Sequence, residues 1–412
     1  MNYIKKYTVK NFYSIRNEVT VDLSAGDYTA EHHAYRVFSD NNNAEKYGKL
    51  KVFYGSNASG KTSLLRALVH TAYLASNKSD HTAPAFKNIY SSEEESFVEI
   101  DLKCDGVDFR YKMIFESKEN QIVGISNEIL IRNDTNPTEL INREERIFKN
   151  LAGDDIQGLL FDKVPKYRSL LIESLTRDES YEGLVNFFSN LFYLSNIDGT
   201  FTVKFDSEGF GNLIVANAFF NQESAVDSFR NKITLEEKKE FQKFVLPFLQ
   251  GLDIDIVGGD SVIEFDKDKK SVEYDFFTKH SIDSTKLLDF NLESSGTKML
   301  FSILYDIYYA WKKGSVLVID ELDSILHPML VPAINILAAT NNVQLLYTTH
   351  NIYNLKYLYN DEIFLIEKDQ KHNTTVRDAK LHPGYENFAV LYEENQLGGL
   401  PELSNLNFVM GQ

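Results

Sequence analysis

The sequence feature that most constrains the fold of this chain is a glycine-rich octapeptide between a predicted strand and a predicted helix. The octapeptide is Gly55-Ser56-Asn57-Ala58-Ser59-Gly60-Lys61-Thr62, and Ser63 follows it directly. The apolar run Leu50–Tyr54 precedes it, and residues at helical spacing continue to about Leu74. Strand, glycine-rich loop and helix in this order form a P-loop, which favours this interpretation over an ordinary glycine turn before a helix. The sequence therefore predicts that the chain binds a nucleoside triphosphate.

The residue types of the P-loop match what a triphosphate requires. Gly55 and Gly60 let the backbone fold closely around phosphate oxygens, so that successive N–H groups bind an anion at a helix N-terminus. Lys61 is predicted to contact the β and γ phosphates, and the Thr62 hydroxyl is predicted to bind Mg²⁺. We therefore predict that the P-loop and Ser63 form the binding site for ATP.

A second apolar run, Ser315–Glu321, ends in two carboxylates, Asp320 and Glu321. A run that is apolar on both faces suits a central parallel strand, and ligands of such sheets bind at the carboxyl ends of the strands. We predict that Asp320 holds Mg²⁺, directly or through water, and that Glu321 orients and polarises the attacking water. A hydrophobic strand that merely ends in Asp-Glu is the alternative, which the upstream P-loop disfavours.

Two further segments carry polar residues at positions where ligands bind. Asn342–His350 is another buried strand, and its final His350 is predicted to reach the γ-phosphate or the water; a satisfied core or surface histidine is the alternative. Ser294, Ser295 and Gly296 precede a predicted helix, where hydroxyls and backbone N–H groups form an anion site. By themselves these three residues favour an ordinary helix N-cap.

The N-terminal part of the chain is predicted to be rich in paired strands. Tyr3–Phe12 and Glu18–Leu23 alternate apolar and polar residues, as two paired strands do. Ser96–Lys103, Asp108–Phe115 and Gln121–Arg132 are separated by turn residues and predict an antiparallel meander. We assign residues 1–153 to the N-terminal half of one α/β domain with a β lobe.

The middle of the chain, residues 154–251, is predicted to be a helical insert. The aromatic residues Phe187, Phe188, Phe192 and Tyr193 are expected to serve packing rather than function. Thr234–Glu237 has the spacing of a capping box and begins a predicted helix that ends near Leu249.

Residues 252–412 are predicted to complete the α/β domain. Short strands come first, and helices and buried strands alternate from Ser294, as in the second half of a P-loop sheet. The predicted short strands are Asp253–Val257, Ser261–Phe265, Val272–Phe277 and Lys286–Leu292, with Asp266–Lys270 as a solvated hairpin tip. A further strand is expected at Asp361–Asp369.

Composition narrows the class of protein. A net charge of −17 and a pI near 5.0 offer no global basic field for nucleic acid, and they favour protein partners or the nucleotide alone. The single cysteine, Cys104, excludes an internal disulfide and fits a reducing compartment. We see no signal-peptide pattern and no apolar stretch of about 18 residues, so we expect a cytoplasmic protein without a membrane span.

In chain order, five segments resemble motifs of the ABC-type AAA ATPases, relatives of RecF, SMC heads and the ATPase half of OLD-family proteins. The resemblance spans the whole chain except the predicted helical insert. Its segments are Asn11–Ser14, the P-loop, Glu293–Thr297, Asp320–Pro328 and Thr348–His350. The Asp320–Pro328 segment and the later Leu397–Pro401 are similar to a stand-alone bacterial branch found in phage-defence and abortive-infection operons.

The resemblance implies a role for several of these residues. Glu293–Lys298 would be the ABC signature, in which Ser294, Ser295 and Gly296 contact the γ-phosphate of ATP held by another protomer. Leu322–His327 would be the D-loop, and His350 the switch histidine.

Two features of the sequence depart from the family pattern. The signature has Ser-Ser-Gly-Thr in place of Ser-Gly-Gly-Gln, and no glutamine matches the Q-loop, since the surroundings of Gln121 do not resemble that motif.

We therefore expect a P-loop α/β ATPase head, with an antiparallel β lobe and a helical insert, that dimerises around ATP and Mg²⁺. The resemblance implies a sensor or regulator in anti-phage defence. Its effector is expected to be a separate protein, because no second catalytic cluster is recognisable and the scattered His280, His372 and His382 are predicted to be surface residues. A DNA-repair or chromosome-maintenance ATPase that clamps DNA is the alternative, which the acidic charge and the lack of coiled-coil arms disfavour. A transporter subunit is a third possibility, which the signature and the β lobe disfavour.

Overall fold

The computed structural model of the chain describes most of its residues between Met1 and Ala379. The described ranges are 1–26, 31–39, 45–76, 85–134, 136–195, 202–203, 235–252, 254–266, 271–324 and 326–379. Thr234, the hairpin tip at 267–270, His382 and Leu397–Pro401 lie outside the described residues. Within the described part, no helix is long and apolar enough to cross a membrane.

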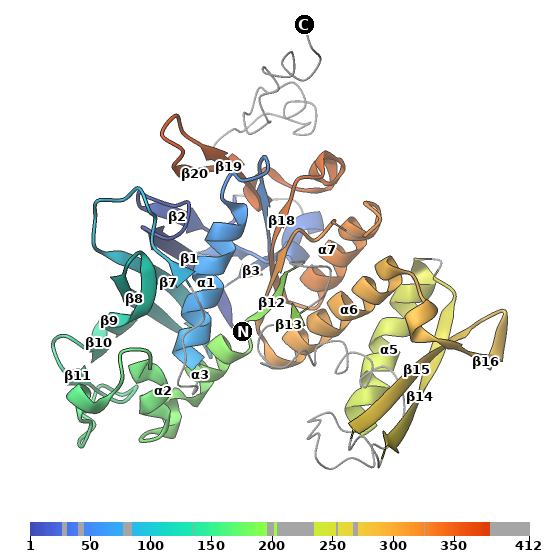
Figure 1. Cartoon of the computed structure of the whole chain (residues 1–412), viewed down its shortest axis with the longest axis horizontal. Coiled ribbons are helices and arrows are strands. Elements are labelled where there is room, and N and C mark those ends of the chain that lie inside the picture. Colours follow the sequence, from blue (N-terminus) through green and yellow to red (C-terminus); the bar gives the residue numbers. More distant parts are fainter. Residues whose placement is uncertain are drawn as a thin grey trace, which may run out of the picture.

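A seven-stranded central sheet carries the predicted nucleotide site (Figure 1). Its order is β13-β12-β17-β18-β5-β19-β20, in which the five inner strands are parallel and the two edge strands are antiparallel. The strands are β5 (Leu50–Tyr54), β12 (Phe192–Ser195), β13 (Thr202–Val203), β17 (Val316–Asp320), β18 (Gln344–Thr349), β19 (Ile363–Lys368) and β20 (Thr374–Asp378). The P-loop strand β5 and the Asp-Glu strand β17 both pair with β18, so their carboxyl ends meet at one edge.

The middle strands β5, β17 and β18 are buried on both faces, since successive strand residues point to opposite sides and both sets are packed in a core. On one face Phe53, Val318 and Leu346 pack in a core with α1 (Lys61–Ser76). On the other face strand residues pack with two further helices, α6 (Ser295–Lys313) and α7 (Leu330–Thr340). Burial on both sides explains why these strands are continuous apolar runs.

A second, eight-stranded antiparallel sheet lies on the other side of α1 (Figure 1). Its order is β11-β10-β9-β8-β7-β1-β2, with β6 beside β9, and it confirms both the predicted strand pair and the predicted meander. The strands are β1 (Tyr3–Lys10), β2 (Val19–Asp22), β6 (Ala85–Phe86), β7 (Ser96–Cys104), β8 (Val107–Lys118), β9 (Gln121–Arg132), β10 (Thr138–Asn142) and β11 (Ile147–Phe148). Helix α1 is therefore enclosed between two sheets.

The range predicted as a helical insert contributes to several parts of the molecule. Helices α2 (Leu170–Leu175) and α3 (Glu182–Ser189) pack in the same core as α1. The next residues form β12, which pairs with β17 of the central sheet, whereas α5 (Leu235–Gly251) packs on α6 through Phe241. The described part of this range, predicted to be mostly helical, thus also contains strands β12 and β13, because a short apolar run after a helix does not show from sequence that it joins a distant sheet. The boundaries at 153/154 and 251/252 stay a prediction.

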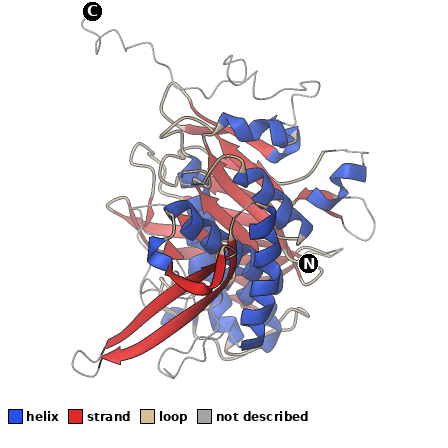
Figure 2. Cartoon of the chain, turned by 90° about the vertical axis from the view of Figure 1, so that its right-hand side faces the viewer, coloured by secondary structure: helices blue, strands red, loops and turns tan. Residues whose placement is uncertain are grey.

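A three-stranded antiparallel sheet precedes α6 and extends from the rest of the molecule as a long hairpin (Figure 2). It consists of β14 (Ile256–Asp266), β15 (Ser271–His280) and β16 (Asp283–Asp289), and the 3-10 turn η4 (Phe290–Leu292) leads from it into α6. Strand β14 begins at Ile256, near the end of the predicted strand 253–257, and continues through the predicted strand 261–265, since Gly258 and Gly259 stay extended with a register shift after Ile256. The predicted strand 286–292 ends at Asp289, where η4 begins.

Short elements complete the described chain. Strands β3 (Val37–Ser39) and β4 (Lys46–Gly48) form a small ladder near the start of β5. The remaining 3-10 turns are η1 (Glu31–Arg36), η2 (Phe161–Lys163), η3 (Glu179–Tyr181), η5 (Ile352–Tyr357) and η6 (Asn360–Glu362).

Candidate nucleotide-binding site

The P-loop connects the end of β5 to the start of α1 in a conformation that needs its glycines. Gly60 has a φ of +112°, a backbone geometry that side chains disfavour. A Cβ at Gly60 would lie 2.1 Å from the Thr374 hydroxyl, and one at Gly55 would lie 2.2 Å from the Ile366 carbonyl oxygen. The loop is therefore packed tightly against β19 and β20, which leaves no room for a side chain at either glycine.

The Lys61 side chain is buried under the P-loop backbone. Its Nζ donates to the carbonyl oxygens of Gly55 at 2.8 Å and Ser56 at 3.0 Å. Burial lowers the pKa of Lys61, while the carboxylates Asp320, Glu321 and Asp323 act in the opposite direction. A partly desolvated ammonium with three donors is stabilised by an anion that binds at the loop.

Asp320 joins three elements of the site through one oxygen. Its Oδ1 accepts hydrogen bonds from Thr62 Oγ1 of α1 at 3.1 Å and from Thr348 Oγ1 of β18 at 2.6 Å. Thr348 Oγ1 in turn accepts from the Glu321 backbone N–H at 2.7 Å. Asp320 is only 6% exposed. Sequence reasoning gave Thr348 no role of its own, although a hydroxyl within a buried apolar strand was a usable signal.

Glu321 and His350 lie at the same edge of the sheet. Glu321 has a φ of 55°, a left-handed geometry that costs about 1 kcal/mol or more in a residue other than glycine and that clusters at functional sites. In the strand register Tyr54 pairs with Thr349, so Gly55 and the exposed His350 follow side by side. The structure thus brings Glu321 and His350 to the edge that carries the P-loop.

A cluster of hydroxyl groups supports the P-loop from behind. Ser14 Oγ donates to Ser63 Oγ at 2.9 Å, and Thr374 Oγ1 donates to the Ser59 carbonyl at 2.9 Å and lies within hydrogen-bond distance of Ser14 Oγ, at 2.8 Å. Ser63, predicted to contact the nucleotide, thus also holds the loop that follows β1. Sequence reasoning missed Thr374 because Ser14 and Thr374 are 360 positions apart.

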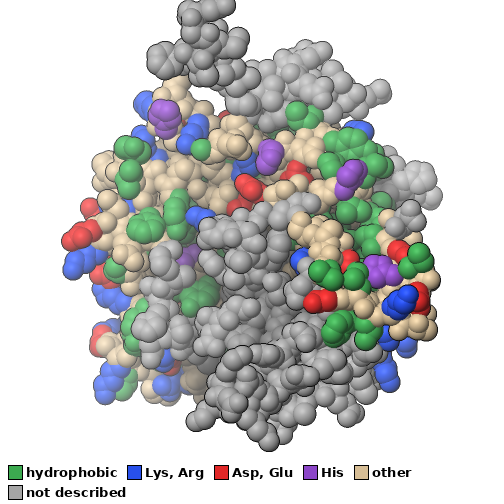
Figure 3. Space-filling model, turned by 45° about the vertical axis from the view of Figure 1, so that its right-hand side comes forward, with side chains coloured by type: hydrophobic (Ala, Val, Ile, Leu, Met, Phe, Trp, Pro, Cys, Tyr) green, Lys and Arg blue, Asp and Glu red, His purple; other side chains and the backbone are tan. Residues whose placement is uncertain are grey.

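The predicted signature begins α6 on the other face of the central sheet from α1. Ser294 is the N-cap of α6, and its Oγ accepts from the Thr297 backbone N–H at 3.0 Å, as the N-cap interpretation predicted. Ser294 and Ser295 are exposed, and so is the nearby Leu292, at 72%. Other exposed hydrophobic side chains lie on this side of the molecule (Figure 3). A single chain therefore does not place the signature on its own P-loop.

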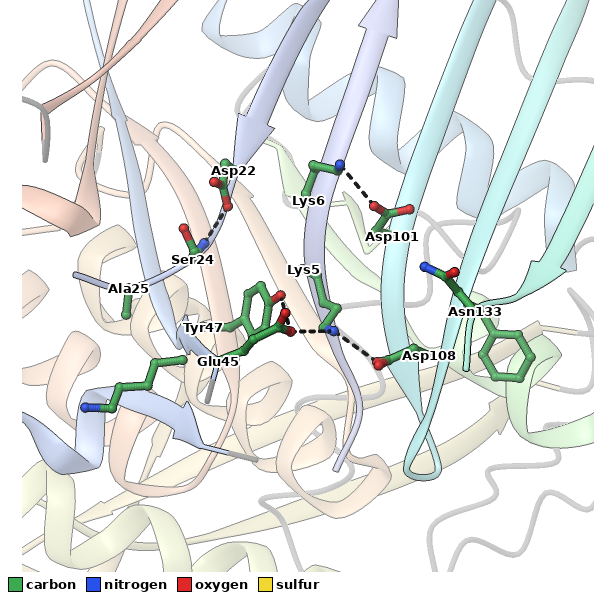
Figure 4. Close-up of a pocket in the computed structure, with 12 residues that line it drawn as sticks. Lys5, Lys6, Asp22, Ser24, Ala25, Glu45, Tyr47, Asp101, Asp108 and Asn133 are labelled. Atoms are coloured by element: carbon green, nitrogen blue, oxygen red, sulfur yellow. Dashed lines mark hydrogen bonds and ion pairs between the residues drawn. The ribbon is translucent and has the colours of Figure 1, made fainter. Parts of the chain in front are cut away.

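A cavity of about 530 Å³ lies elsewhere, on the antiparallel sheet (Figure 4). Charged residues line it, but they form ion pairs with each other: Lys5 with Glu45 at 3.1 Å and Asp108 at 3.2 Å, and Lys6 with Asp101 at 3.2 Å. None of the predicted site residues lines this cavity. We therefore assign it no part in nucleotide binding.

Three known structures are similar to the chain at low identity. The SMC head domain from Thermotoga maritima has 12% sequence identity and a TM-score of 0.45, and the match covers 91% of this chain and 98% of that chain. An Smc head bound to the C-winged helix domain of ScpA has 13% identity and a TM-score of 0.49, with coverage of 91% of this chain and 97% of that chain. An Smc head with an extended coiled coil bound to the C-terminal domain of ScpA, derived from Pyrococcus furiosus, has 14% identity and a TM-score of 0.42, with coverage of 92% and 96%. These similarities are too weak to carry an argument about function.

A family model matched to the sequence shows which family the chain belongs to. A comparison with curated proteins found no match. The family model described as "AAA domain, putative AbiEii toxin, Type IV TA system" matches residues 50–355, which is more than half of the chain and spans the P-loop, the signature, Asp320 and His350. The resemblance to ABC-type AAA ATPases is confirmed. The chain belongs to this AAA-domain family.

Proposed function

We propose that the chain binds ATP with Mg²⁺ and hydrolyses it. The observation that carries this proposal is the meeting of Thr62 and Thr348 on Asp320 Oδ1, which joins the P-loop to the carboxylate strand. Hydroxyl and carboxylate oxygens are the ligands that Mg²⁺ prefers, so Thr62 and Asp320 would hold it. Within the described part of the chain, the buried Ser59 Oγ has no hydrogen-bond partner, which leaves a donor in the loop for a phosphate oxygen.

The remaining residues of the edge would act on the attacking water. Glu321 would orient the water and polarise it, and His350 would contact the γ-phosphate or the water. Lys61 would stabilise the charge on the β and γ phosphates, together with the backbone N–H groups of residues 56–60. Bound Mg²⁺ would supply additional positive charge at the phosphate oxygens.

A second copy of the chain would complete each site. Because α1 and α6 cover opposite faces of the central sheet, Ser294, Ser295 and Gly296 are available to the nucleotide of another chain rather than to their own. ATP would thus hold two heads together, and hydrolysis would release them. Turnover in such a pair acts as a timer of an assembled state.

For the biological role, we propose a cytoplasmic sensor or regulator of a separate effector protein in anti-phage defence. The description of the matched family names a toxin and a toxin–antitoxin system, which supports a place in such a system, and the separate effector is our own proposal. The net charge of −17 disfavours the alternative, a head that clamps DNA directly. Pull-down of the pure protein on duplex DNA separates the two: binding at low salt that is lost steeply at high salt would favour the DNA clamp.

Replacing Glu321 by Gln tests the ATPase proposal. Glu321→Gln should bind Mg-ATP normally but hydrolyse it more slowly, by about 10²-fold or more, because a lost base acts on the transition state rather than on binding. It should also accumulate an ATP-dependent dimer, measured by light scattering with ADP as the reference nucleotide. Exposed Glu182→Gln is the matched control. Turnover at the wild-type rate in Glu321→Gln would contradict the role of this residue.

A further inference from the structure

The residue immediately before the signature N-cap is held by β15. Glu293 Oε1 accepts hydrogen bonds from His280 Nε2 at 2.8 Å and from Thr278 Oγ1. The Glu293 side chain is 9% exposed, and Thr278 is fully buried. This contact, which we call the Glu293 clamp, consists of Glu293, His280 and Thr278, and it ties the three-stranded sheet to the start of α6.

The clamp is a strong contact for physical reasons. An ionised carboxylate can only accept hydrogen bonds, so His280 Nε2 carries the hydrogen. Hydrogen bonds to a charged group are about twice as strong as neutral ones, and exclusion of water strengthens them further. His280 Nδ1 also lies 4.0 Å from Asp255 Oδ2, in the segment between α5 and β14. The prediction of His280 as a surface residue was therefore incomplete: it is half-buried between two carboxylates.

The clamp lies at the start of the signature. Ser294 has an extended backbone, with a φ of −60° and a ψ of 150°, and α6 starts at the next residue. On one side, η4 is held to α6 by the ring contact of Phe290 with Phe301, at 5.7 Å between centroids. On the other side, Glu293 is held to β15. The exposed Ser294 and Ser295 thus lie where the chain turns into α6, between these two contacts.

We propose that His280 and Thr278 are positioning residues for the composite site: through Glu293 they orient Ser294 and Ser295 toward the nucleotide of a second copy. This inference rests on the proposed function, in which the signature acts on the other chain. It also assigns a role to the three-stranded sheet, which contains none of the site residues predicted from the sequence but contacts the start of the signature.

The test compares four variants of the full chain. His280→Ala and Thr278→Val remove one donor each, His280→Gln keeps an N–H donor, and His372→Asn is a control at an exposed histidine. His280→Ala and Thr278→Val should leave ATP binding to one chain unchanged. In the Glu321→Gln background they should weaken the ATP-dependent dimer about tenfold, as the loss of one hydrogen bond to a charged group implies. His280→Gln should restore much of this loss, and His372→Asn should have no effect.

A second measurement does not require ATP. Amide hydrogen exchange at residues 294–298 of the free protein should be faster in His280→Ala than in the wild type, because the start of α6 loses its link to β15. Faster exchange over the whole chain would instead indicate general destabilisation. The near-isosteric Thr278→Val would then be measured: faster exchange at residues 294–298 alone supports the positioning role, and unchanged exchange there overturns it.

The possible failures are distinguishable. If Glu321→Gln forms the dimer and His280→Ala dimerises and exchanges like the wild type, the positioning role is wrong and the proposed function stands. If no ATP-dependent dimer forms in the Glu321→Gln background, the proposed function fails. The positioning role, which rests on that function, then fails with it, and the exchange measurement tests only whether the clamp holds the start of α6.

Discussion

At the scale of single residues, the candidate site combines a buried cation, a shared carboxylate and a strained backbone. Lys61 is bonded to the carbonyl oxygens of its own loop, so it is held in place before any phosphate arrives. Asp320 shares one oxygen between two hydroxyl groups, and Glu321 adopts a left-handed geometry directly after it. Strain of this kind persists where surrounding contacts over-determine it, here through the Thr348 hydroxyl.

Lys61→Ala should lose ATP affinity about 10²-fold or more, because the phosphates lose a buried, charge-assisted partner. Isothermal titration calorimetry measures this directly. Lys166→Ala is the matched control, since Lys166 is exposed and pairs with Glu116 on the antiparallel sheet. Unchanged nucleotide affinity in Lys61→Ala would show that the nucleotide binds elsewhere.

Thr348→Val keeps the shape of the side chain but removes both hydrogen bonds of the hydroxyl. The Glu321 N–H then loses its acceptor, at a cost of about 1–3 kcal/mol. We expect turnover to fall about tenfold or more, with a smaller change in ATP affinity, since Lys61 and the loop are untouched. Steady-state kinetics and calorimetry separate the two effects. Thr375→Val, on the edge strand β20, is the control; equal kinetics of the two variants would argue against a role for Thr348.

At the scale of elements, α1 links the nucleotide site to the antiparallel sheet. Its N-terminus carries Lys61 and Thr62, and its buried side packs against both sheets. His70, in the middle of α1, lies between the rings of Phe12 and Phe115, with centroid distances of 5.9 and 5.6 Å. Burial lowers the pKa of His70 to about 4. A group whose pKa falls on folding makes the stability of the protein depend on pH.

The sign of this dependence follows from proton uptake. Between the ordinary pKa of 6.5 and the folded value of about 4, the unfolded chain binds a proton that the folded chain excludes. Stability is therefore lost as the pH falls through this window, by about 2 kcal/mol between about pH 7.5 and about pH 5. His70→Phe should remove this part of the pH dependence, measured by urea unfolding at both pH values. His372→Asn should retain it, and so should His70→Phe if His70 does not titrate as we infer.

At the scale of the whole molecule, the two halves of the proposed active site lie on opposite faces of one sheet. The P-loop leads into α1 on one face, and the signature begins α6 on the other. Two chains related by a two-fold axis would each present a P-loop to the signature of the other. The acidic net charge and the exposed Leu292 beside the signature fit contact with protein at this surface.

Mixing two inactive variants tests this arrangement. Ser295→Arg should bind ATP almost normally yet not hydrolyse it, because the arginine blocks the site of the partner. In a mixed dimer with Lys61→Ala, both defects fall in one composite site and the other site is intact. Equal mixing should therefore return activity, roughly a quarter of the wild-type rate if chains exchange freely and the two sites act independently. Strong hydrolysis by Ser295→Arg alone would refute a signature that acts in trans.

The sequence by itself determined the parts of this protein whose signals are local. The P-loop, the apolar run that ends in Asp320 and Glu321, and the buried strand before His350 each occupy fewer than ten consecutive residues. Their periodicity and turn chemistry specify strand, loop and helix without reference to the rest of the chain. The family match over residues 50–355 agrees with these motifs.

Tertiary structure alone decided how these parts meet. The place of β12 beside β17 left no recognisable pattern in the sequence. Ser14 and Glu293 lie in recognised motif segments, but their contacts with Thr374 and His280 did not follow from those motifs. Each depends on hydrogen bonds between segments that tertiary packing, and not local propensity, brings together. A hydroxyl or a histidine has the same neighbours in sequence whether it faces water or a buried carboxylate. Only the folded chain determines which of these it meets.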